Sequence, residues 1–397
     1  MANDLTLTNL ANDIYVAADT VGREAVGFIP SVTMNADSTR AAVGDTIKAA
    51  VTSEAPAFVD ISNGLMSVPE GSDQTVTAST FQLTNAKAIQ IPMGAEKELQ
   101  LRNAGTYETV YGDLVQQAMR KLANQMESDL FVEAKNNASR ALGTVGTDPF
   151  AFSSTTTGLE QAAKMRRLLV DNGMPTDDVS VVLNTQAGGS FRASRTNAFA
   201  DHAGTADFRN NGTLANLFGA SVRESSQSAL HTAGTEAAWA INNGSNEVVG
   251  ETTLTVDAGA GGTILNGDII TNAGDTTSGY VVSSDAQTAS GAAGGNIIIN
   301  GSKGILTQAD DDDVVTRVAS YQSNLMFHRR ALELGMRAPA LPSVGDAADD
   351  AILVQDPVSG LVFEVRIYKG YRKSMIEVAA CWGVKAWKSD FIGNIYQ

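Results

Sequence analysis

A long amphipathic segment, residues 106–142, constrains the fold more than any other part of the sequence. It reads TYETVYGDLVQQAMRKLANQMESDLFVEAKNNASRAL. Apolar side chains recur there at spacings of three and four, which predicts a single long helix. The face that they share carries Tyr111, Leu114, Val115, Ala118, Leu122, Met126, Leu130 and Ala134. We expect Gly143 to end the helix. At a rise of about 1.5 Å per residue the rod is on the order of 50 Å long, so it would span a flat or elongated domain.

Two segments of alternating polar and apolar residues precede this helix. GDTIKAAVT and DQTVTASTFQLTNAKAIQIPM lie on either side of the turn-rich SVPEGSD, residues 67–73. Pro69 and Gly71 mark a bend between them. The pattern predicts a long hairpin or a pair of two-stranded ribbons.

The first 35 residues differ from both of these segments. They are weakly amphipathic and are interrupted by Gly22, Gly27 and Pro30, which favours an arm over a core element. They also carry acidic residues where a signal peptide has a basic end and an apolar run. We therefore expect a chain that is made and kept in a cytoplasm.

Beyond residue 150 the sequence contains three segments with different residue patterns. A second helix, ending near Gly173, is followed by a buried strand at 179–183. Residues 233–320 hold five or six short strands separated by Gly, Asn and Asp turns. We expect this block to be an inserted domain that closes into a small barrel or sandwich, because open strand edges promote aggregation. Residues 321–397 return to longer strands, which must pair with segments that precede the insertion.

Composition excludes several classes of protein. The net charge is −16, and no window gathers the Lys and Arg residues that phosphate neutralisation requires, which argues against direct nucleic-acid binding. Cys381 is the single cysteine, so no intrachain disulfide or cysteine metal cage can form. It lies in the apolar run VAACWGV, where a buried inert thiol is expected. No window approaches the roughly 20 apolar residues of a membrane span.

Candidate chemical groups are few. The sequence has no phosphate-binding loop, no HExxH and no GxSxG motif. Clustered carboxylates suit a hard cation, so the run Asp310, Asp311, Asp312 and Asp313 is a candidate metal site; the alternative is a solvated acidic turn. His202 and His231 lie in polar, loop-like sequence and are interpreted as surface histidines. We therefore expect neither catalysis nor a cofactor.

One compact group remains, in SYQSNLMFHRRALELGMRAP, residues 320–339. It places His328 beside Arg329 and Arg330 in a chain with three histidines. Such a group could be an active site, or it could serve structure and subunit contact.

The order of the segments resembles that of the major capsid proteins of tailed bacteriophages. The resemblance is to the coat-protein family of the short-tailed Salmonella phages, which carry an inserted β domain. It rests on RKLANQMESDLFVEAKN (120–136), LFGASVRESSQSALHTAG (217–234), NLMFHRRALELGMRAPALP (324–342) and WGVKAWKSDFIGNIY (382–396). The resemblance spans most of the chain. The insertion and the first 35 residues resemble the family only in the type of element that they form.

The resemblance implies an α+β chain with the Hong Kong phage capsid fold and an inserted, small, all-β, barrel-like domain. It divides the chain into an N-terminal arm (1–41), an extended loop (42–93), the spine helix of a peripheral domain (94–150), peripheral and axial parts (151–232), the inserted β domain (233–320) and axial and peripheral strands (321–397). His328, Arg329 and Arg330 then lie where the chain rejoins the core, and structural or subunit-contact roles are expected for them.

The resemblance also implies a function and partners. The chain would self-assemble through hexamers and pentamers into an icosahedral shell around double-stranded DNA, without sequence-specific binding. Its location would be the virion capsid, assembled in the cytoplasm of a bacterial host. A scaffolding protein, a portal protein and a decoration or cement protein are the expected partners. Acidic arm residues would receive the scaffold: Asp13, Asp19 and Glu24.

Two other functions stay open at this point. An encapsulin-like compartment shares the fold, although such chains are generally shorter and lack this insertion. A β-rich adhesin or decoration protein would explain the Gly, Thr and Asn content of residues 240–320, but it would not explain the long helix.

Overall fold

The computed structural model describes most of the chain. The described residues are 7–24, 27–49, 79–105, 107–151, 160–198, 219–236, 238–258, 261–275, 277–283, 287–288, 295–356 and 359–397. Within them the chain forms five α-helices: α1 (Leu7–Glu24), α2 (Ala95–Asn103), α3 (Tyr107–Asn136), α4 (Glu160–Asp171) and α5 (Thr185–Ala198). Three short 3-10 helices accompany them: η1 (Ile29–Ser31), η2 (Arg329–Ala331) and η3 (Ser389–Phe391).

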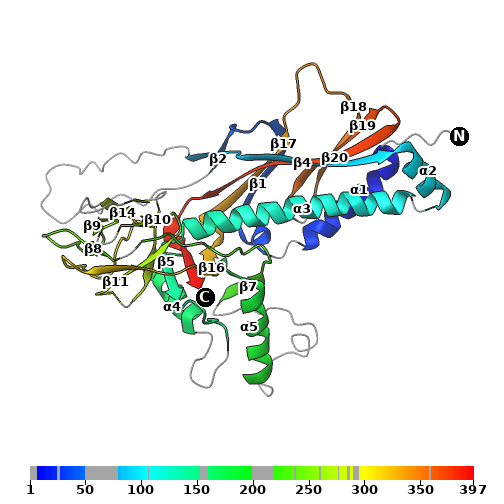
Figure 1. The fold of residues 1–397 in the computed structure, drawn as a ribbon. Coiled ribbons are helices and arrows are strands. Elements are labelled where there is room, and N and C mark those ends of the chain that lie inside the picture. Colours follow the sequence, from blue (N-terminus) through cyan, green and yellow to red (C-terminus); the bar gives the residue numbers. More distant parts are fainter. Residues whose placement is uncertain are drawn as a thin grey trace, which may run out of the picture.

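The helix α3 is the long element of the molecule and runs across it as a rod (Figure 1). Its 30 residues confirm the predicted long helix, and the predicted face is buried except at Leu114, which is half-buried. The predicted stop is wrong. The helix ends at Asn136, and Gly143 closes the strand β5 (Arg140–Gly143) instead. A side chain at Gly143 would collide with the Tyr396 carbonyl oxygen, because a Cβ there would lie 2.0 Å from it.

A six-stranded sheet lies along α3. Its order is β1-β17-β20-β19-β18, and β4 pairs with the other edge of β20. These strands are β1 (Thr33–Ala41), β4 (Asn85–Gly94), β17 (Leu332–Pro339), β18 (Ala348–Gln355), β19 (Val362–Gly370) and β20 (Lys373–Ala386). Three bonds join helix and sheet. Trp382 Nε1 and Asn85 Nδ2 donate to Asp129 Oδ2 at 2.8 Å and 3.0 Å, and the Ala386 amide donates to Glu133 Oε1 at 3.0 Å.

A two-stranded ribbon leaves the sheet next to β17 and β20. It consists of β2 (Thr46–Ala49) and β3 (Ser79–Gln82), which are antiparallel, as predicted. Its base is anchored on Gly335, where a Cβ would lie 2.6 Å from atoms of both Ile47 and Phe81. The predicted bend at Pro69 and Gly71 lies outside the described residues.

A second sheet of 11 strands carries the rest of the chain. Its order is β14-β9-β8-β15-β11-β12-β5-β21-β16-β6-β7. The strands not yet given are β6 (Val179–Leu183), β7 (Ala220–Glu224), β8 (Trp239–Ile241), β9 (Thr253–Ala258), β11 (Ile269–Asn272), β12 (Gly279–Val281), β14 (Gly295–Ile298), β15 (Val314–Arg317), β16 (Ser323–His328) and β21 (Ile392–Tyr396). A further pair stands apart, β10 (Thr263–Ile264) with β13 (Gln287–Thr288). The predicted buried strand at 179–183 is confirmed as β6.

The inserted block is close to a closed barrel. Six of its strands are neighbours in the second sheet, and a bridge between Val282 and Ile299 joins the ends of β12 and β14. The barrel has its own apolar core, which includes Trp239, Ile241 and Val256. It is continuous with the rest of the sheet, because β12 pairs with β5. Whether 233–320 is a separable domain stays a prediction.

The strands after the insertion pair as predicted with segments before it. β16 pairs with β6, β21 with β5, β17 with β1, and β20 with β4. The predicted α+β architecture is thereby confirmed.

The first 35 residues contribute to the core, which corrects the expectation that they do not. In α1 the side chains of Ile14, Ala17, Ala18 and Val21 are buried at helical spacing, and α1 packs against α3. Gly27, which follows α1, has a role in packing and is more than a break in the helical pattern. At Gly27 a Cβ would lie 2.4 Å from Glu127 Oε2, so the absence of a side chain permits a close approach to α3.

Candidate functional site

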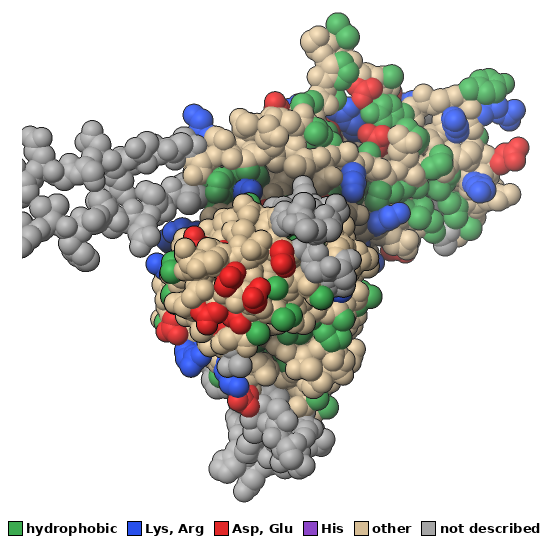
Figure 2. Space-filling model, turned by 60° about the vertical axis from the view of Figure 1, so that its left-hand side comes forward, with side chains coloured by type: hydrophobic (Ala, Val, Ile, Leu, Met, Phe, Trp, Pro, Cys, Tyr) green, Lys and Arg blue, Asp and Glu red, His purple; other side chains and the backbone are tan. Residues whose placement is uncertain are grey.

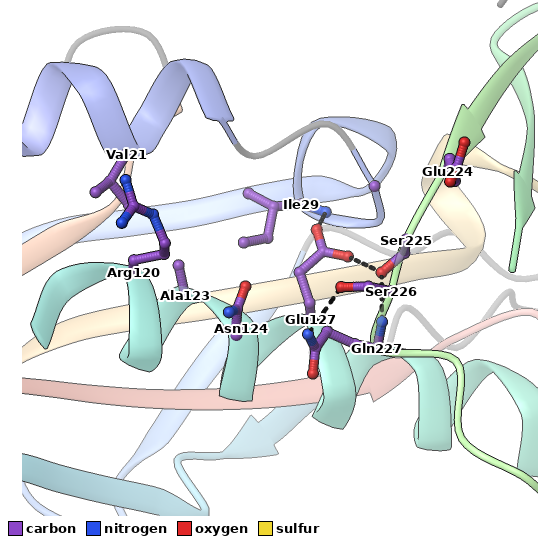
Figure 3. Close-up of a pocket in the computed structure, with 11 residues that line it drawn as sticks. Val21, Ile29, Arg120, Ala123, Asn124, Glu127, Glu224, Ser225, Ser226 and Gln227 are labelled. Carbon is purple, nitrogen blue, oxygen red and sulfur yellow. Dashed lines mark hydrogen bonds between the residues drawn. The ribbon is translucent and has the colours of Figure 1, made fainter. Parts of the chain in front are cut away.

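A buried carboxylate on α3 gathers segments that are far apart in the sequence (Figure 3). Glu127 accepts hydrogen bonds from the amide of Phe28 at 2.8 Å and the amide of Ile29 at 2.7 Å. The Ser225 hydroxyl donates to the same carboxylate at 3.0 Å. One side chain therefore joins the turn after α1, the helix α3 and the segment that follows β7.

A small pocket of about 100 Å³ opens beside this carboxylate. It is lined by Val21, Gly27, Ile29, Arg120, Ala123, Asn124, Glu127, Glu224, Ser225, Ser226 and Gln227 (Figure 3). Burial raises the pKa of Glu127, while the three hydrogen bonds oppose that rise. The carboxylate is bound by donors from its own chain, and among the described residues the lining contains no histidine, cysteine or lysine. The arrangement suits a structural clasp rather than acid–base chemistry.

A second buried polar group lies at the C-terminal end of α3. Lys135 Nζ is 2.6 Å from His231 Nδ1, and His231 Nε2 is 2.7 Å from Asp268 Oδ1. The His231 ring packs on Tyr321 with 4.9 Å between ring centroids. Burial lowers the pKa of Lys135 to about 8, and the nearby Asp268 charge opposes that shift. Burial likewise raises the pKa of the Tyr321 hydroxyl.

This group overturns one sequence interpretation. His231 was interpreted as a surface histidine, but it is buried and bonded at both ring nitrogens. The polar sequence around it misled the interpretation, because its partners lie 96 and 37 residues away. The other histidine interpreted in that way, His202, lies outside the described residues.

A third polar contact connects β5 to the inserted barrel. Arg140 is buried, donates to the Gly304 carbonyl at 2.7 Å and lies over the Tyr280 ring at 5.1 Å. Tyr280 in turn donates to Asp275. Burial lowers the pKa of Arg140, and burial together with the Asp275 bond raises that of Tyr280. The insertion is therefore attached through polar contacts as well as through paired strands.

His328 has a structural position. Its side chain is buried, and its Nδ1 accepts from the Arg330 amide at 3.1 Å, which caps η2. Its ring meets Phe391 edge-on at 6.2 Å. Burial lowers the pKa of His328, and the carboxylates of Asp177 and Asp178 oppose that shift. These contacts fit the structural reading of this residue.

The two arginines beside it are exposed. Arg329 reaches back to the Val32 carbonyl at 3.3 Å. Their predicted role in subunit contact stays a prediction.

The carboxylates of the acidic run bind nearby groups of the chain instead of converging. Asp313 accepts from the Asp310 amide at 2.9 Å, and Asp311 accepts from the Asn243 amide at 2.9 Å. Asp312 has a left-handed backbone, with φ at 68°. Across the part of the chain that the structure describes, no three His, Cys, Asp or Glu side chains could hold a metal ion together. The arrangement favours the alternative, an acidic turn.

The predicted scaffold-contact residues lie on α1. Asp13 and Asp19 are half-buried, and Asp13 lies against α3, since a Cβ at Gly112 would be 3.4 Å from its Cβ. The side chain of Glu24 lies outside the described residues. Their role stays a prediction.

Sequence reasoning missed Glu127 and Lys135, although the helix carried a signal for both. They belong to one row at a spacing of four residues, Met119, Ala123, Glu127, Phe131 and Lys135, and every side chain in that row is buried. A charge inside an otherwise apolar row requires a partner from elsewhere in the fold.

The remaining expectations concern burial. Cys381 is buried, as expected, and burial raises the pKa of its thiol. Within the described ranges, no helix combines the length and the apolar character needed to span a membrane.

Comparison with known proteins gives structural neighbours only. No family model and no curated protein matches the sequence. The capsid of the cyanophage P-SCSP1u is 10% identical, with 94% of this chain and 88% of that chain covered and a TM-score of 0.43. The mature capsid of bacteriophage PhiM1 gives 9% identity, coverages of 91% and 85%, and a TM-score of 0.42. A virus-like particle from Pyrococcus furiosus is 7% identical, with 97% of this chain and 98% of that chain covered and a TM-score of 0.41. Two of these are phage capsids and one is a virus-like particle.

Proposed function

We propose that this chain is the major capsid protein of a tailed bacteriophage, and that it self-assembles into the icosahedral shell around the double-stranded DNA genome. The observation that carries the proposal is the subunit's own architecture. A 30-residue helix lies along a long sheet, a ribbon leaves one side of that sheet, and an inserted barrel lies at the end of the helix (Figure 1). Long subunits with projecting ribbons suit lateral packing into a wall.

The ribbon also bears on the proposed shell. A two-stranded ribbon is only marginally stable alone in water. The bases of β2 and β3 are supported within the subunit, where Ile47 and Phe81 pack on Gly335, and any part of the ribbon that extends beyond this base would need a further surface such as a neighbouring subunit. Contacts of modest strength, roughly −4 to −8 kcal/mol each, allow misplaced subunits to leave before the shell closes.

The parts of the chain receive roles within this proposal. Residues 42–93 are the extended loop over a neighbour, 94–150 hold the spine helix, and 233–320 are the inserted domain. His328, Arg329 and Arg330 contribute to structure and subunit contact. A scaffolding protein, a portal protein and a decoration or cement protein are the proposed partners, and the location is the virion capsid after assembly in the host cytoplasm.

Sedimentation and negative-stain microscopy test the proposal. The full chain is expressed alone and together with the scaffolding protein of the same phage. We expect closed polyhedral shells, or spirals and irregular shells that the scaffold corrects. A discrete small oligomer under every condition would contradict the proposal. Shells that copurify with an enzyme in place of a scaffold would favour an encapsulin-like compartment.

The scaffold contact has its own test. Asp13→Lys with Asp19→Lys reverses two charges on α1, and we expect less scaffold in the purified shells. Thermal unfolding of the variant checks that α1 still packs on α3. Unchanged scaffold content in a stably folded variant would exclude these two residues as the contact.

A further inference from the structure

The contact between α3 and the inserted block has a defined arrangement of protons. A lysine ammonium only donates hydrogen bonds, so His231 Nδ1 accepts from Lys135 across 2.6 Å. Asp268 accepts from the amides of Leu265 at 2.7 Å and Gly234 at 3.1 Å, as a carboxylate does. His231 Nε2 therefore donates to Asp268 across 2.7 Å. These bonds assign the ring proton to Nε2 and leave Nδ1 as the acceptor.

The turn that carries Asp268 is fitted closely to the end of α3. A Cβ at Gly267 would lie 2.5 Å from Asn136 Oδ1 and 3.1 Å from Lys135 Nζ. The Tyr321 hydroxyl donates to the Gly267 carbonyl at 2.5 Å. The backbones of His231 and Tyr321 also bond to each other, at 2.9 Å and 3.2 Å. The turn therefore has little room to move while the Lys135–His231 bond is intact.

A second proton on His231 is incompatible with this arrangement. It would go to Nδ1 and place two N–H groups, both on cations, face to face across 2.6 Å. The charged and titratable groups around the ring are Lys135 from α3, Asp268 from the turn before β11, and Tyr321, which packs on Tyr396 of β21. Asp268 balances one positive charge on the Lys135–His231 pair but not two. Since Lys135, His231 and Asp268 are all buried, water screens the repulsion poorly.

Other contacts of the insertion do not involve this proton. β12 stays paired with β5 through Gly279 with Ala141 and Tyr280 with Arg140. Arg140 keeps its bond to the Gly304 carbonyl. Asn300 Nδ2 likewise keeps its bond to the Asn136 carbonyl at 2.7 Å. These contacts keep the insertion attached when the Lys135–His231 bond breaks, so the expected change is a loosening and not a release.

We propose that Lys135, His231 and Asp268 form a pH-sensitive lock between the end of α3 and the base of the inserted block, and that protonation of His231 breaks the Lys135–His231 bond and loosens the block while the β5–β12 pairing holds. Histidine is the side chain whose charge changes in the mildly acidic range. The lock does not depend on shell formation, so it operates in the single subunit.

Distance measurement between two spin labels tests the lock. The labels are placed through Val132→Cys on α3 and Val249→Cys in the insertion, whose side chains are 43% and 62% exposed. The native Cys381 is buried and resists labelling. We expect one narrow distance distribution at about pH 7.5 and a shifted or broadened one at about pH 5. Identical distributions at both pH values would overturn the proposal.

Two variants identify the responsible group. In His231→Gln the amide oxygen can accept from Lys135 and the amide nitrogen can donate to Asp268, but the side chain does not titrate. We expect its distance distribution to be narrow at both pH values. His328→Gln changes the other described buried histidine, and we expect it to respond to pH as the unmodified chain does. A pH response in His231→Gln equal to that of the unmodified chain would contradict the assignment to His231. If that variant does not fold, the labelled native chain still decides whether the lock exists.

Discussion

The body around α3 and the inserted block are stabilised in different ways. The body uses long strands, up to the 14 residues of β20, which pack apolar faces on one helix. No strand that starts after residue 233 and ends before 320 exceeds six residues among those the structure describes. The insertion holds 14 of the chain's 37 glycines, and its 11 acidic and two basic residues carry more than half of the net charge of −16. Acidic side chains accordingly gather on the face turned forward in Figure 2, where the insertion lies.

This difference indicates which kind of interaction determines the structure of each region. In the body, hydrophobic periodicity determines which faces meet. In the insertion, turns with positive φ and close backbone contacts determine the path of the chain, and buried polar contacts attach it to α3 and β5. Substitutions that remove apolar volume should therefore act most strongly in the body, and substitutions that add a Cβ most strongly in the insertion.

The largest loss in the free energy of unfolding is expected from Phe131→Ala in the body. Phe131 is 1% exposed and meets Phe28 edge-on at 6.0 Å, so the substitution leaves a cavity between α3 and the N-terminal turn. We expect a loss of about 3–5 kcal/mol in the free energy of unfolding, measured by urea denaturation. Val132→Ala, at the neighbouring exposed position, is the control and should change that free energy by less than about 0.5 kcal/mol. Similar losses for both variants would contradict the packing described for α3.

A smaller loss is expected from Gly304→Ala in the insertion. Gly304 has φ at +54°, and a Cβ there would lie 2.3 Å from backbone atoms of Gly250 and Glu251. Strain and overlap together should cost about 3 kcal/mol in the free energy of unfolding. Gly345→Ala, also at positive φ but with open space around it, should cost about 1 kcal/mol. Equal costs would mean that the backbone contact in the barrel is not required.

Glu127→Gln tests a buried charge inside the body. Phe28 and Ile29 donate to different oxygens of the carboxylate, and glutamine replaces one of these oxygens by an NH₂ group. One buried N–H therefore loses its partner, at a cost of about 1–3 kcal/mol. Because burial raises the pKa of Glu127 above its ordinary value of 4.5, the folded state binds this proton more readily than the unfolded state. The stabilisation that this proton gives the folded state is complete below about pH 4.5. It is lost as the pH rises through the pKa that Glu127 has in the folded state.

The cost of this substitution should therefore be largest in acid and should shrink as the pH rises. Urea denaturation of both proteins across the acidic range measures it. A difference between the two proteins that does not vary with pH would contradict the raised pKa of Glu127.

The smallest effect is expected at the acidic turn of the insertion. Asp312 is exposed and has a left-handed backbone, which asparagine also tolerates. Asp312→Asn should change the free energy of unfolding by less than about 0.5 kcal/mol. Millimolar Ca²⁺ should leave the melting temperature unchanged in both proteins. A rise with Ca²⁺ in the native chain that is lost in the variant would reinstate Asp310–Asp313 as a metal site.

The sequence predicts the body around α3 better than it predicts the contacts that α1 and the inserted block make with that body. The apolar row of α3 and the pairing of the late strands with early ones follow from periodicity and order. The burial of α1 was missed because Gly22 and Gly27 resemble breaks, although Ile14, Ala17, Ala18 and Val21 have helical spacing. The Lys135–His231–Asp268 group could not be predicted, since its members come together only when the insertion docks, and none of them forms a local motif.

The central claim is that this subunit builds a closed wall. Electron cryomicroscopy of the full chain assembled with its scaffolding protein tests it most directly. We predict closed icosahedral shells in which α3 and the six-stranded sheet lie within the wall and the ribbon of β2 and β3 contacts a neighbouring copy. Discrete small oligomers, or a wall in which the ribbon contacts only its own subunit, would contradict it.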